Sequence, residues 1–238
     1  MNPRFYAPAA RAGGVIALPD EEGQHLTRVL RLKVGAAIRV FDGRGHEFDA
    51  LVEKAGKGEV LVTVGTARPA AAAEPRIAIT LAQAVLKGDK MDDVVRDAVM
   101  MGVAAIQPIV TARTEVSLAA LQRGRRRDRW QRIAVSSAKQ CGRATVPEVR
   151  EPVAFNPVTG LMFVEPGAST DLVSLSDLDT AAPRDVTVAI GSEGGWTEEE
   201  VRRGAAACRL ITLRGPTLRA DAMALVALAA LFAVWREF

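Results

Sequence analysis

The sequence predicts an α/β protein, with a small β-rich module at its N-terminus followed by a larger, mostly parallel sheet. Two observations predict this fold class. Short β-branched runs separated by glycine turns fill the first 66 residues, whereas apolar runs alternate with amphipathic helices from residue 77 onward. Such alternation is typical of parallel sheets, because each crossover between parallel strands needs a long connection, usually a helix. We expect two domains, at residues 1–68 and 76–238, joined by the Ala- and Pro-rich stretch 66–76.

Three β-like runs and one helix make up the predicted N-terminal module. The runs are separated by Asp42-Gly43 and by a glycine-containing stretch, both typical of turns, and they are IRVF (38–41), EFDALV (47–52) and VLVTV (60–64). Residues 21–31 have apolar positions at helical spacing, with basic residues on the remaining face. They predict a helix that opens at Asp20 and interrupts the strands.

The larger domain is predicted to begin with the strand IAITLAQAV (77–85). A helix at 91–101 follows, because its apolar residues fall on one face and Gly102 stands at the C-cap position. Further strands are predicted at 103–110, 161–165, 186–190 and 209–213, with a helix over 198–208. The last apolar run, 222–235, is shorter than the roughly 20 residues that cross a bilayer, so we expect a buried helix there.

Composition narrows the classes of function. The 238 residues carry 31 Lys and Arg against 28 Asp and Glu, a net charge of +3 that permits an anionic partner. Cys141 and Cys208 lie far apart and outside any C-x-x-C motif, which predicts neither a disulfide framework nor a metal site. Because the N-terminus also lacks an apolar signal core, we expect a cytoplasmic protein with no membrane association and no bound metal.

The stretch AIGSEGGWTEEEV (189–201) says the most about a ligand-binding site. A glycine turn follows an apolar strand, and Thr197 with Glu200 predicts a capping box that starts a helix. Glycines at such a turn leave main-chain N–H groups free to face a ligand. The spacing is not G-x-G-x-x-G, no Gly-Lys-Ser/Thr follows, and Glu193 would repel a phosphate. The pattern favours a zwitterionic, cationic or neutral ligand, unless the glycines serve the turn geometry alone.

Two other strand ends carry comparable loops. Glu165-Pro166-Gly167 follows one predicted strand, and a loop from Arg214 to Arg219 follows another. Ligands of open α/β sheets lie beyond the carboxyl ends of the strands. These loops offer main-chain groups, carboxylates and arginines, but no Ser-His-Asp set and no metal cluster, so hydrolysis is poorly supported. A reaction that depends on positioning, with the reactive group supplied by a bound cofactor, fits these residues.

Five segments, in the same order along the chain, resemble those of a known family. They are HLTRVLRLKVGAAIRVFDGRGHEFDA (25–50), LKGDKMDDVVRDAVMMGVAAIQPIVTART (86–114), RWQRIAVSSAKQCGRATVPEV (129–149), IGSEGGWTEEEV (190–201) and LRGPTLRADAMALVALAAL (213–231). On these motifs the chain resembles the bacterial 16S ribosomal RNA uridine-N3 methyltransferases of the SPOUT superfamily. The resemblance implies a PUA-like RNA-binding β-barrel at 1–68 and a SPOUT methyltransferase domain with a C-terminal trefoil knot at 76–238.

The resemblance also implies a function. The family uses S-adenosylmethionine to methylate N3 of a uridine in the decoding region near the 3′ end of 16S ribosomal RNA, acting as a homodimer on the assembled small subunit. Carried over by position, the cofactor site comprises Phe163, Val164, Glu165, Gly191, Glu193, Gly194, Leu213, Gly215, Leu218 and Arg219. The chain departs from the family at Ser192, where proline is common, and at Ala220-Asp221-Ala222, where the family has Thr-Glu-Thr. Asp221 either replaces the longer carboxylate or caps the last helix.

Arg219 and Glu193 are the predicted catalytic residues. Uridine N3 becomes a nucleophile only when its proton is lost, and Arg219 can stabilise the resulting anion because its guanidinium is always charged. Glu193 is either the proton acceptor or a carboxylate that only positions the turn. Methylation at uracil C5 commonly uses a thiol that adds to C6, whereas methylation at N3 needs none, so we interpret Cys141 as a packing residue. The two histidines, His25 and His46, have no predicted catalytic role.

RNA contacts are predicted on two basic stretches of the chain, and Gln140 and Arg143 are predicted to contact either RNA or the other subunit of a dimer. The predicted RNA-binding residues are Arg28, Arg31, Lys33, Arg123, Arg125, Arg126, Arg127, Gln140 and Arg143. The run 121–132 is either a phosphate-contacting arm or a solvated loop that leads into a helix, and Trp130 either stacks on a base or packs on the sheet. Two other functions stay open, a ribose 2′-O-methyltransferase of the same fold and a basic RNA-binding factor without catalysis.

Overall fold

The computed structural model describes residues 2–56, 58–169 and 171–237, and the chain divides into two compact units. One unit contains residues 1–74 together with 135–146, and the other contains 75–134 together with 147–238. The helix α4 (Arg126–Cys141) contributes residues to both units. The predicted domain limits at 68 and 76 stay a prediction, because the units are defined by packing rather than by continuous sequence.

The first unit is built on a mixed sheet of five strands, in the order β1-β3-β4-β5-β2. The strands are β1 (Arg4–Tyr6), β2 (Val15–Ala17), β3 (Ala37–Phe41), β4 (Glu47–Ala55) and β5 (Val60–Arg68). Alternate residues of β3 to β5 point into an apolar core that includes Ile38, Val40 and Val62. The three strands expected from the sequence are therefore confirmed, and β1 and β2 are additions at the sheet edges.

The helical segment of this unit begins at Asp20, as predicted, but it has two parts. The α-helix α1 (Asp20–Gln24) continues as a π-helix, η1 (His25–Val29). Its N-cap is Pro19, and no side chain accepts a hydrogen bond from the free N–H groups there. A π-turn inside a helix is often found at a functional site, and this one places Arg28 and Val29 on the surface.

A buried ion pair holds the first unit together around the end of α4. The Arg4 guanidinium donates two hydrogen bonds to the Glu47 carboxylate, at 3.2 and 3.0 Å, and the Glu47 side chain is fully buried. Arg4 also donates to the main-chain oxygens of Ala138, Lys139 and Arg143. These carbonyls lie at the C-terminus of a helix, where a cation interacts favourably with the helix dipole.

The second unit contains a parallel sheet with the strand order β11-β13-β10-β12-β6-β7-β8, and β9 also pairs with β7. Every strand pair in it is parallel. The strands are β6 (Ala78–Ala84), β7 (Ala105–Val110), β8 (Glu148–Val149), β9 (Val153–Ala154), β10 (Gly160–Phe163), β11 (Val173–Ser174), β12 (Asp185–Ile190) and β13 (Cys208–Thr212). The predicted class, α/β with a parallel sheet, is confirmed.

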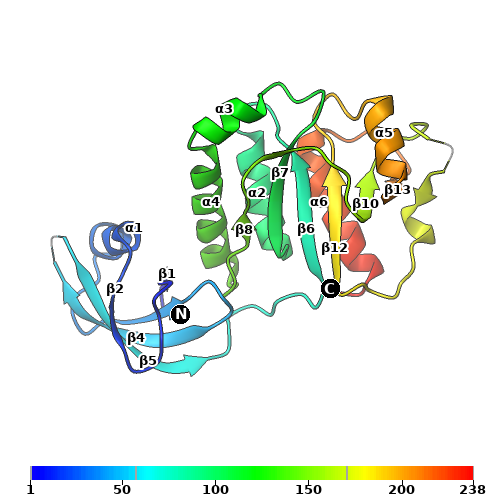
Figure 1. Cartoon of the computed structure of the whole chain (residues 1–238). Helices are drawn as coiled ribbons and strands as arrows, with labels where there is room; N and C mark the ends of the chain where they lie inside the picture. The colour runs from blue at the N-terminus through cyan, green and yellow to red at the C-terminus, as the bar shows by residue number, and fades with distance from the viewer. Residues whose placement is uncertain (1, 57, 170, 238) are drawn as a thin grey trace. The chain divides into compact units, whose positions relative to one another are not determined.

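Helices cover this sheet as the alternation in the sequence predicts. In Figure 1, α2 (Lys90–Met101) and α6 (Ala220–Val234) lie together on one face of the sheet. The remaining helices are α3 (Leu118–Arg123), α4, the short 3₁₀ turn η2 (Leu175–Asp177) and α5 (Glu198–Ala205). Gly102 ends α2 in the left-handed conformation with φ of 105°, as its C-cap position predicts.

Three predicted details of the helices are resolved by the structure. Asp221 does not cap α6, because the N-cap is Arg219 and no side chain makes a capping hydrogen bond there. Trp130 packs rather than stacks on a base, since its side chain in α4 is 2% exposed. The basic run is helical on both sides of Gly124 rather than an unstructured loop.

Removing the Arg4 side chain tests the buried ion pair. Because Arg4→Met leaves the Glu47 carboxylate buried without its main partner, we expect the first unit to lose about 3–5 kcal/mol of stability. The measurement is urea-dependent hydrogen exchange of peptides from β3 and β4. The matched control is Arg68→Met, which breaks an exposed pair with Asp49 and should cost less than about 1 kcal/mol. Equal losses in the two variants would show that the pair does not stabilise this unit.

Candidate functional site

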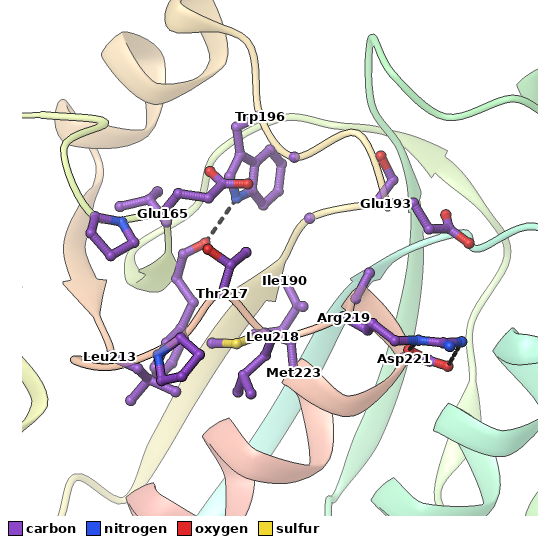
Figure 2. A pocket seen from close by; sticks show the side chains of 18 of the residues that line it. Glu165, Ile190, Glu193, Trp196, Leu213, Thr217, Leu218, Arg219, Asp221 and Met223 are labelled. Atoms are coloured by element: carbon purple, nitrogen blue, oxygen red, sulfur yellow. Dashed lines mark hydrogen bonds and ion pairs between the residues drawn. The ribbon is translucent and has the colours of Figure 1, made fainter.

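A pocket of about 240 Å³ lies at the carboxyl ends of three neighbouring parallel strands, β13, β10 and β12. The loops that follow these strands form its walls, together with the start of α6 and Lys90 of α2. Because parallel strands all end at the same edge of a sheet, segments separated by more than fifty residues meet there. Figure 2 shows the side chains that line the pocket.

The pocket brings together all of the predicted cofactor residues except Gly194 and Gly215. The lining contains Phe163, Val164, Glu165, Gly191, Glu193, Leu213, Leu218 and Arg219. Gly194 lies beside it and accepts a hydrogen bond from Arg113 at 2.6 Å. Gly215 has φ of 115°, a value that only glycine adopts readily, so its part in the loop is conformational.

The glycine turn between β12 and α5 is held by a buried carboxylate. Thr197 and Glu200 form the predicted capping box, with Glu200 accepting from the Thr197 N–H at 2.9 Å. The other Glu200 oxygen accepts from the N–H of Ala112, at 2.8 Å, in the loop after β7. One side chain, 6% exposed, therefore connects the start of α5 with a loop some ninety residues earlier in the chain.

Close packing explains two of the glycines in this turn. A Cβ on Gly191 would lie 3.2 Å from the ring of Trp196, which is closer than side-chain atoms normally pack. Gly195 has φ of 67°, and a Cβ there would overlap the carboxylate of Glu165. Trp196 itself is 5% exposed and donates to the main-chain oxygen of Phe163 at 2.8 Å. The glycines therefore allow the turn to pack directly against the pocket wall.

Glu193 is bound by the segment that follows β6. Its carboxylate accepts hydrogen bonds from the Lys90 ammonium at 2.8 Å and from the Lys87 N–H at 3.2 Å. Burial raises the pKa of Glu193, but these hydrogen bonds outweigh it, and the pKa lies below its ordinary value. Because the pKa is lowered, the stability that this bridge contributes is present at neutral pH and is lost only as the pH falls through the lowered pKa.

Arg219 forms an ion pair with Asp221 at the mouth of the pocket. The guanidinium donates two hydrogen bonds to the carboxylate, at 3.0 and 2.7 Å. These hydrogen bonds raise the pKa of Arg219 and lower that of Asp221. The Arg219 side chain is 75% exposed, so water screens the pair and a competing partner can replace it at little energetic cost.

Comparison with known proteins identifies the family. The sequence model of an RNA methyltransferase domain matches residues 73–232, and that of an RNA methyltransferase PUA domain matches residues 18–65. The ribosomal RNA small subunit methyltransferase E of Neisseria gonorrhoeae, solved with S-adenosylmethionine bound, is 31% identical, with 99% of this chain and 98% of that chain covered and a TM-score of 0.86. The chain belongs to the ribosomal RNA small subunit methyltransferase E family.

Other known proteins match similarly. A methyltransferase from Legionella pneumophila, solved with its cofactor bound, is 30% identical, covers 98% of both chains and has a TM-score of 0.87. The Synechocystis family member is 29% identical over 82% of this chain, and the match spans 65% of that protein. The expected PUA-like N-terminal domain and SPOUT methyltransferase domain are confirmed by these matches. The threading of the knot stays a prediction.

Several pocket residues were not predicted from the sequence. Beside Lys90, the lining includes Ser192, Trp196, Thr217 and Met223. Lys90 follows β6, which ends at the same sheet edge as the three strands used in the prediction. Ligands of open α/β sheets lie beyond the carboxyl ends of the strands, and applying this rule to every predicted strand would have pointed to the segment that contains Lys90. Nothing in the sequence indicates which of the apolar residues face the pocket.

The predicted RNA-binding residues of this family member differ in their exposure. Arg28, Arg31, Lys33, Arg123, Arg125, Arg126 and Gln140 are exposed. Arg127 is half-buried and donates to the main-chain oxygen of Val149 at 2.9 Å. Arg143 is 4% exposed and donates to the Glu74 carboxylate at 2.9 Å, so it stabilises the first unit instead of facing solvent.

Two other classes of site, metal centres and membrane-spanning helices, concern the described residues as a whole. Across residues 2–56, 58–169 and 171–237, no three His, Cys, Asp or Glu side chains cluster as ligands for a metal ion. Neither α6 nor any other described helix combines the length and the apolarity that a bilayer crossing requires.

Glu200 offers a test of how the glycine turn is held. Glu200→Gln replaces one acceptor oxygen by an NH₂ group that faces N–H donors, so we expect a loss of about 1–3 kcal/mol in unfolding free energy. Urea unfolding followed by tryptophan fluorescence measures it, because Trp196 lies beside the turn. Glu199→Gln, on the exposed side of α5, is the control and should change stability by less than about 1 kcal/mol. A loss no larger than that of the control would contradict the role given to Glu200.

Proposed function

We propose that this chain transfers a methyl group from S-adenosylmethionine to RNA of the small ribosomal subunit. The observation that carries the proposal is the pocket itself, in which a glycine turn and two further loops meet at one sheet edge. Relatives named ribosomal RNA small subunit methyltransferase E share the fold over nearly the whole chain, and one of them was solved with S-adenosylmethionine bound. We propose the same substrate class, ribosomal RNA of the small subunit, and the same cofactor, S-adenosylmethionine, for this chain.

The residues of the pocket fit S-adenosylmethionine. Its floor is apolar, formed by Ile190, Leu213, Leu218 and Met223, which suits an adenine ring. Its rim carries both signs of charge, with Lys90 bound to Glu193 and Arg219 bound to Asp221. A methionine group is a zwitterion and a sulfonium is a cation, so the ligand offers partners for both signs. A phosphate would instead lie against carboxylates.

The finer proposal is that the acceptor atom is N3 of a uridine in the decoding region near the 3′ end of 16S ribosomal RNA, in the assembled subunit. Methylation at uracil C5 would require a thiol at the site, but neither cysteine lines the pocket in the described part of the chain. Methylation at N3 requires a group that favours the deprotonated base. Arg219 at the pocket mouth is a charged group of this kind.

In the proposed mechanism, bound S-adenosylmethionine supplies a methyl group that the N3 electron pair takes up, while the electrons of the broken C–S bond stay on sulfur. Arg219 donates hydrogen bonds to a uracil oxygen and stabilises the anion formed when the N3 proton leaves. It can do so by exchanging Asp221, an exposed partner, for the base. Exclusion of water by the pocket walls helps, because charge is neutralised as the methyl group moves.

The structure favours a positioning role for Glu193 over the role of proton acceptor. Hydrogen bonds from Lys90 and from the Lys87 N–H keep its pKa low, and a carboxylate with a lowered pKa is a weaker base. The same contacts hold the glycine turn against the segment after β6. We therefore infer that Glu193 fixes the turn and that the N3 proton passes to water or to another group at the mouth.

RNA binding and assembly complete the proposal. The exposed basic residues Arg28, Arg31, Lys33, Arg123, Arg125 and Arg126, with Gln140, are the proposed contacts, mostly to phosphates. In the described residues, Arg123, Arg125 and Arg126 have no ion pair within the chain. We also propose a homodimer, for which the partly exposed Leu225 and Val226 of α6 offer apolar surface.

Identification of the methylated nucleoside tests the function. The protein is incubated with labelled S-adenosylmethionine and either small subunits that lack the modification or free 16S ribosomal RNA, and the labelled nucleoside is analysed. We expect N3-methyluridine, formed on subunits more efficiently than on free RNA. A 2′-O-methylated nucleoside would overturn the N3 assignment, and cofactor binding without transfer to either substrate would overturn the proposal as a whole.

Arg219→Ala separates catalysis from cofactor binding. We expect turnover to fall about 100-fold or more, because the charge that stabilises the N3 anion is lost, while affinity for S-adenosylmethionine stays within a few fold. Single-turnover rates and calorimetry measure the two quantities. The control is Arg214→Ala, an exposed arginine of the same loop that does not line the pocket. Equal losses of rate and affinity in Arg219→Ala would make it a binding residue only.

A further inference from the structure

The polar groups of the pocket lie at two separate ends. In Figure 2, Glu193, Arg219 and Asp221 lie together on one side, and Glu165 with Thr217 lies on the other. Every carboxylate on the first side has a cationic partner within 2.8 Å. Apolar side chains, including Ile190 and Leu218, lie between the two ends. A ligand that fills the pocket therefore meets paired charges at one end and a lone carboxylate at the other.

Glu165 is the lone carboxylate. It stands two residues after the end of β10 and lines the pocket, and its side chain is exposed. Within the described part of the chain, no group donates a hydrogen bond to its carboxylate and no cation pairs with it. The carboxylate lies against Gly195, and the Cβ of any other residue at position 195 would occupy the same space. The glycine thus leaves room for a carboxylate that makes no bond within the protein.

We propose that Glu165 binds the ribose hydroxyls of S-adenosylmethionine and makes the site selective for a ribonucleoside over a 2′-deoxyribonucleoside. The proposal rests on the proposed function, since it assigns one part of that cofactor. A carboxylate has two acceptor oxygens and can take a hydrogen bond from each of two neighbouring hydroxyls. Acidic residues at the ends of parallel strands bind ribose hydroxyls in dinucleotide sites for the same reason.

The opposite orientation of the ligand fits the charges less well. The α-ammonium and α-carboxylate of the methionine part need a carboxylate and a cation close together, and that combination exists only at the end with Lys90 and Arg219. Glu165 has no cation beside it to bind the α-carboxylate. The ribose, whose hydroxyls are donors without charge, is the part of the ligand that an isolated acceptor suits.

Calorimetry with S-adenosylhomocysteine and its 2′-deoxy analogue tests the assignment, because the two ligands share the amino acid part and differ only in one hydroxyl. We expect the wild-type protein to bind the ribose compound about 10- to 100-fold more tightly, the size of one hydrogen bond to a charged acceptor. In Glu165→Ala this preference should fall to near one, and in Glu165→Gln to an intermediate value. Glu198→Ala, an exposed acid of α5 outside the pocket, should keep the wild-type preference.

The ratio between the two ligands separates the possible failures. A general loss of structure in Glu165→Ala would weaken the binding of both ligands equally and leave the ratio of their affinities unchanged, and that result overturns the assignment. Equal affinities of the wild-type protein for the two ligands overturn it as well. A role in binding the α-ammonium gives the same unchanged ratio. If the wild-type protein binds neither ligand, the proposed function itself fails, and that result is distinct from the others. Tryptophan fluorescence confirms that each variant retains the fold around Trp196.

Discussion

The site depends on one buried carboxylate, that of Glu200, which is shared by two segments far apart in the chain. It satisfies the free N–H of Thr197 at the start of α5 and that of Ala112 in the loop after β7. Helix starts leave such N–H groups without partners, and burying them unpaired is costly. By satisfying both, Glu200 holds the glycine turn against its neighbour. The turn can then consist of flexible residues and still form a fixed wall of the pocket.

The glycine turn is held to a second segment by Glu193. Its carboxylate bonds to Lys90 and to the Lys87 N–H in the segment after β6, whereas Glu200 bonds to the loop after β7, the next strand of the sheet. A cofactor binds more tightly when the main-chain groups that contact it are already in place, because no binding energy is then spent on ordering them. The carboxylates of Glu193 and Glu200 thus fix the conformation of the glycine turn. The acid that is free of such contacts, Glu165, is the one available to a ligand.

Local signals in the sequence predicted the parts of the fold that are governed by neighbouring residues. The capping box of Thr197, the C-cap at Gly102 and the apolar strands follow from short-range geometry, and all are confirmed. The edge strands β1 and β2 have three residues each, too few to show a period. Arg143 resembled an RNA contact because its partner, Glu74, is about seventy residues away in sequence. Pairings of this kind are set by the tertiary fold and leave no local pattern.

The charges that line the pocket suggest why the proposed reaction would release its product. The described lining contains two cations, Lys90 and Arg219, and three carboxylates, Glu165, Glu193 and Asp221, so it has one more negative than positive group. S-adenosylmethionine is a net cation because of its sulfonium, whereas the demethylated product is neutral overall. The pocket therefore attracts the methyl donor more strongly than what remains after transfer. Because most of these charged groups are partly exposed, dissolved salt should weaken the preference for the methyl donor over the demethylated product. Bound RNA excludes water from the pocket and would therefore strengthen the same preference.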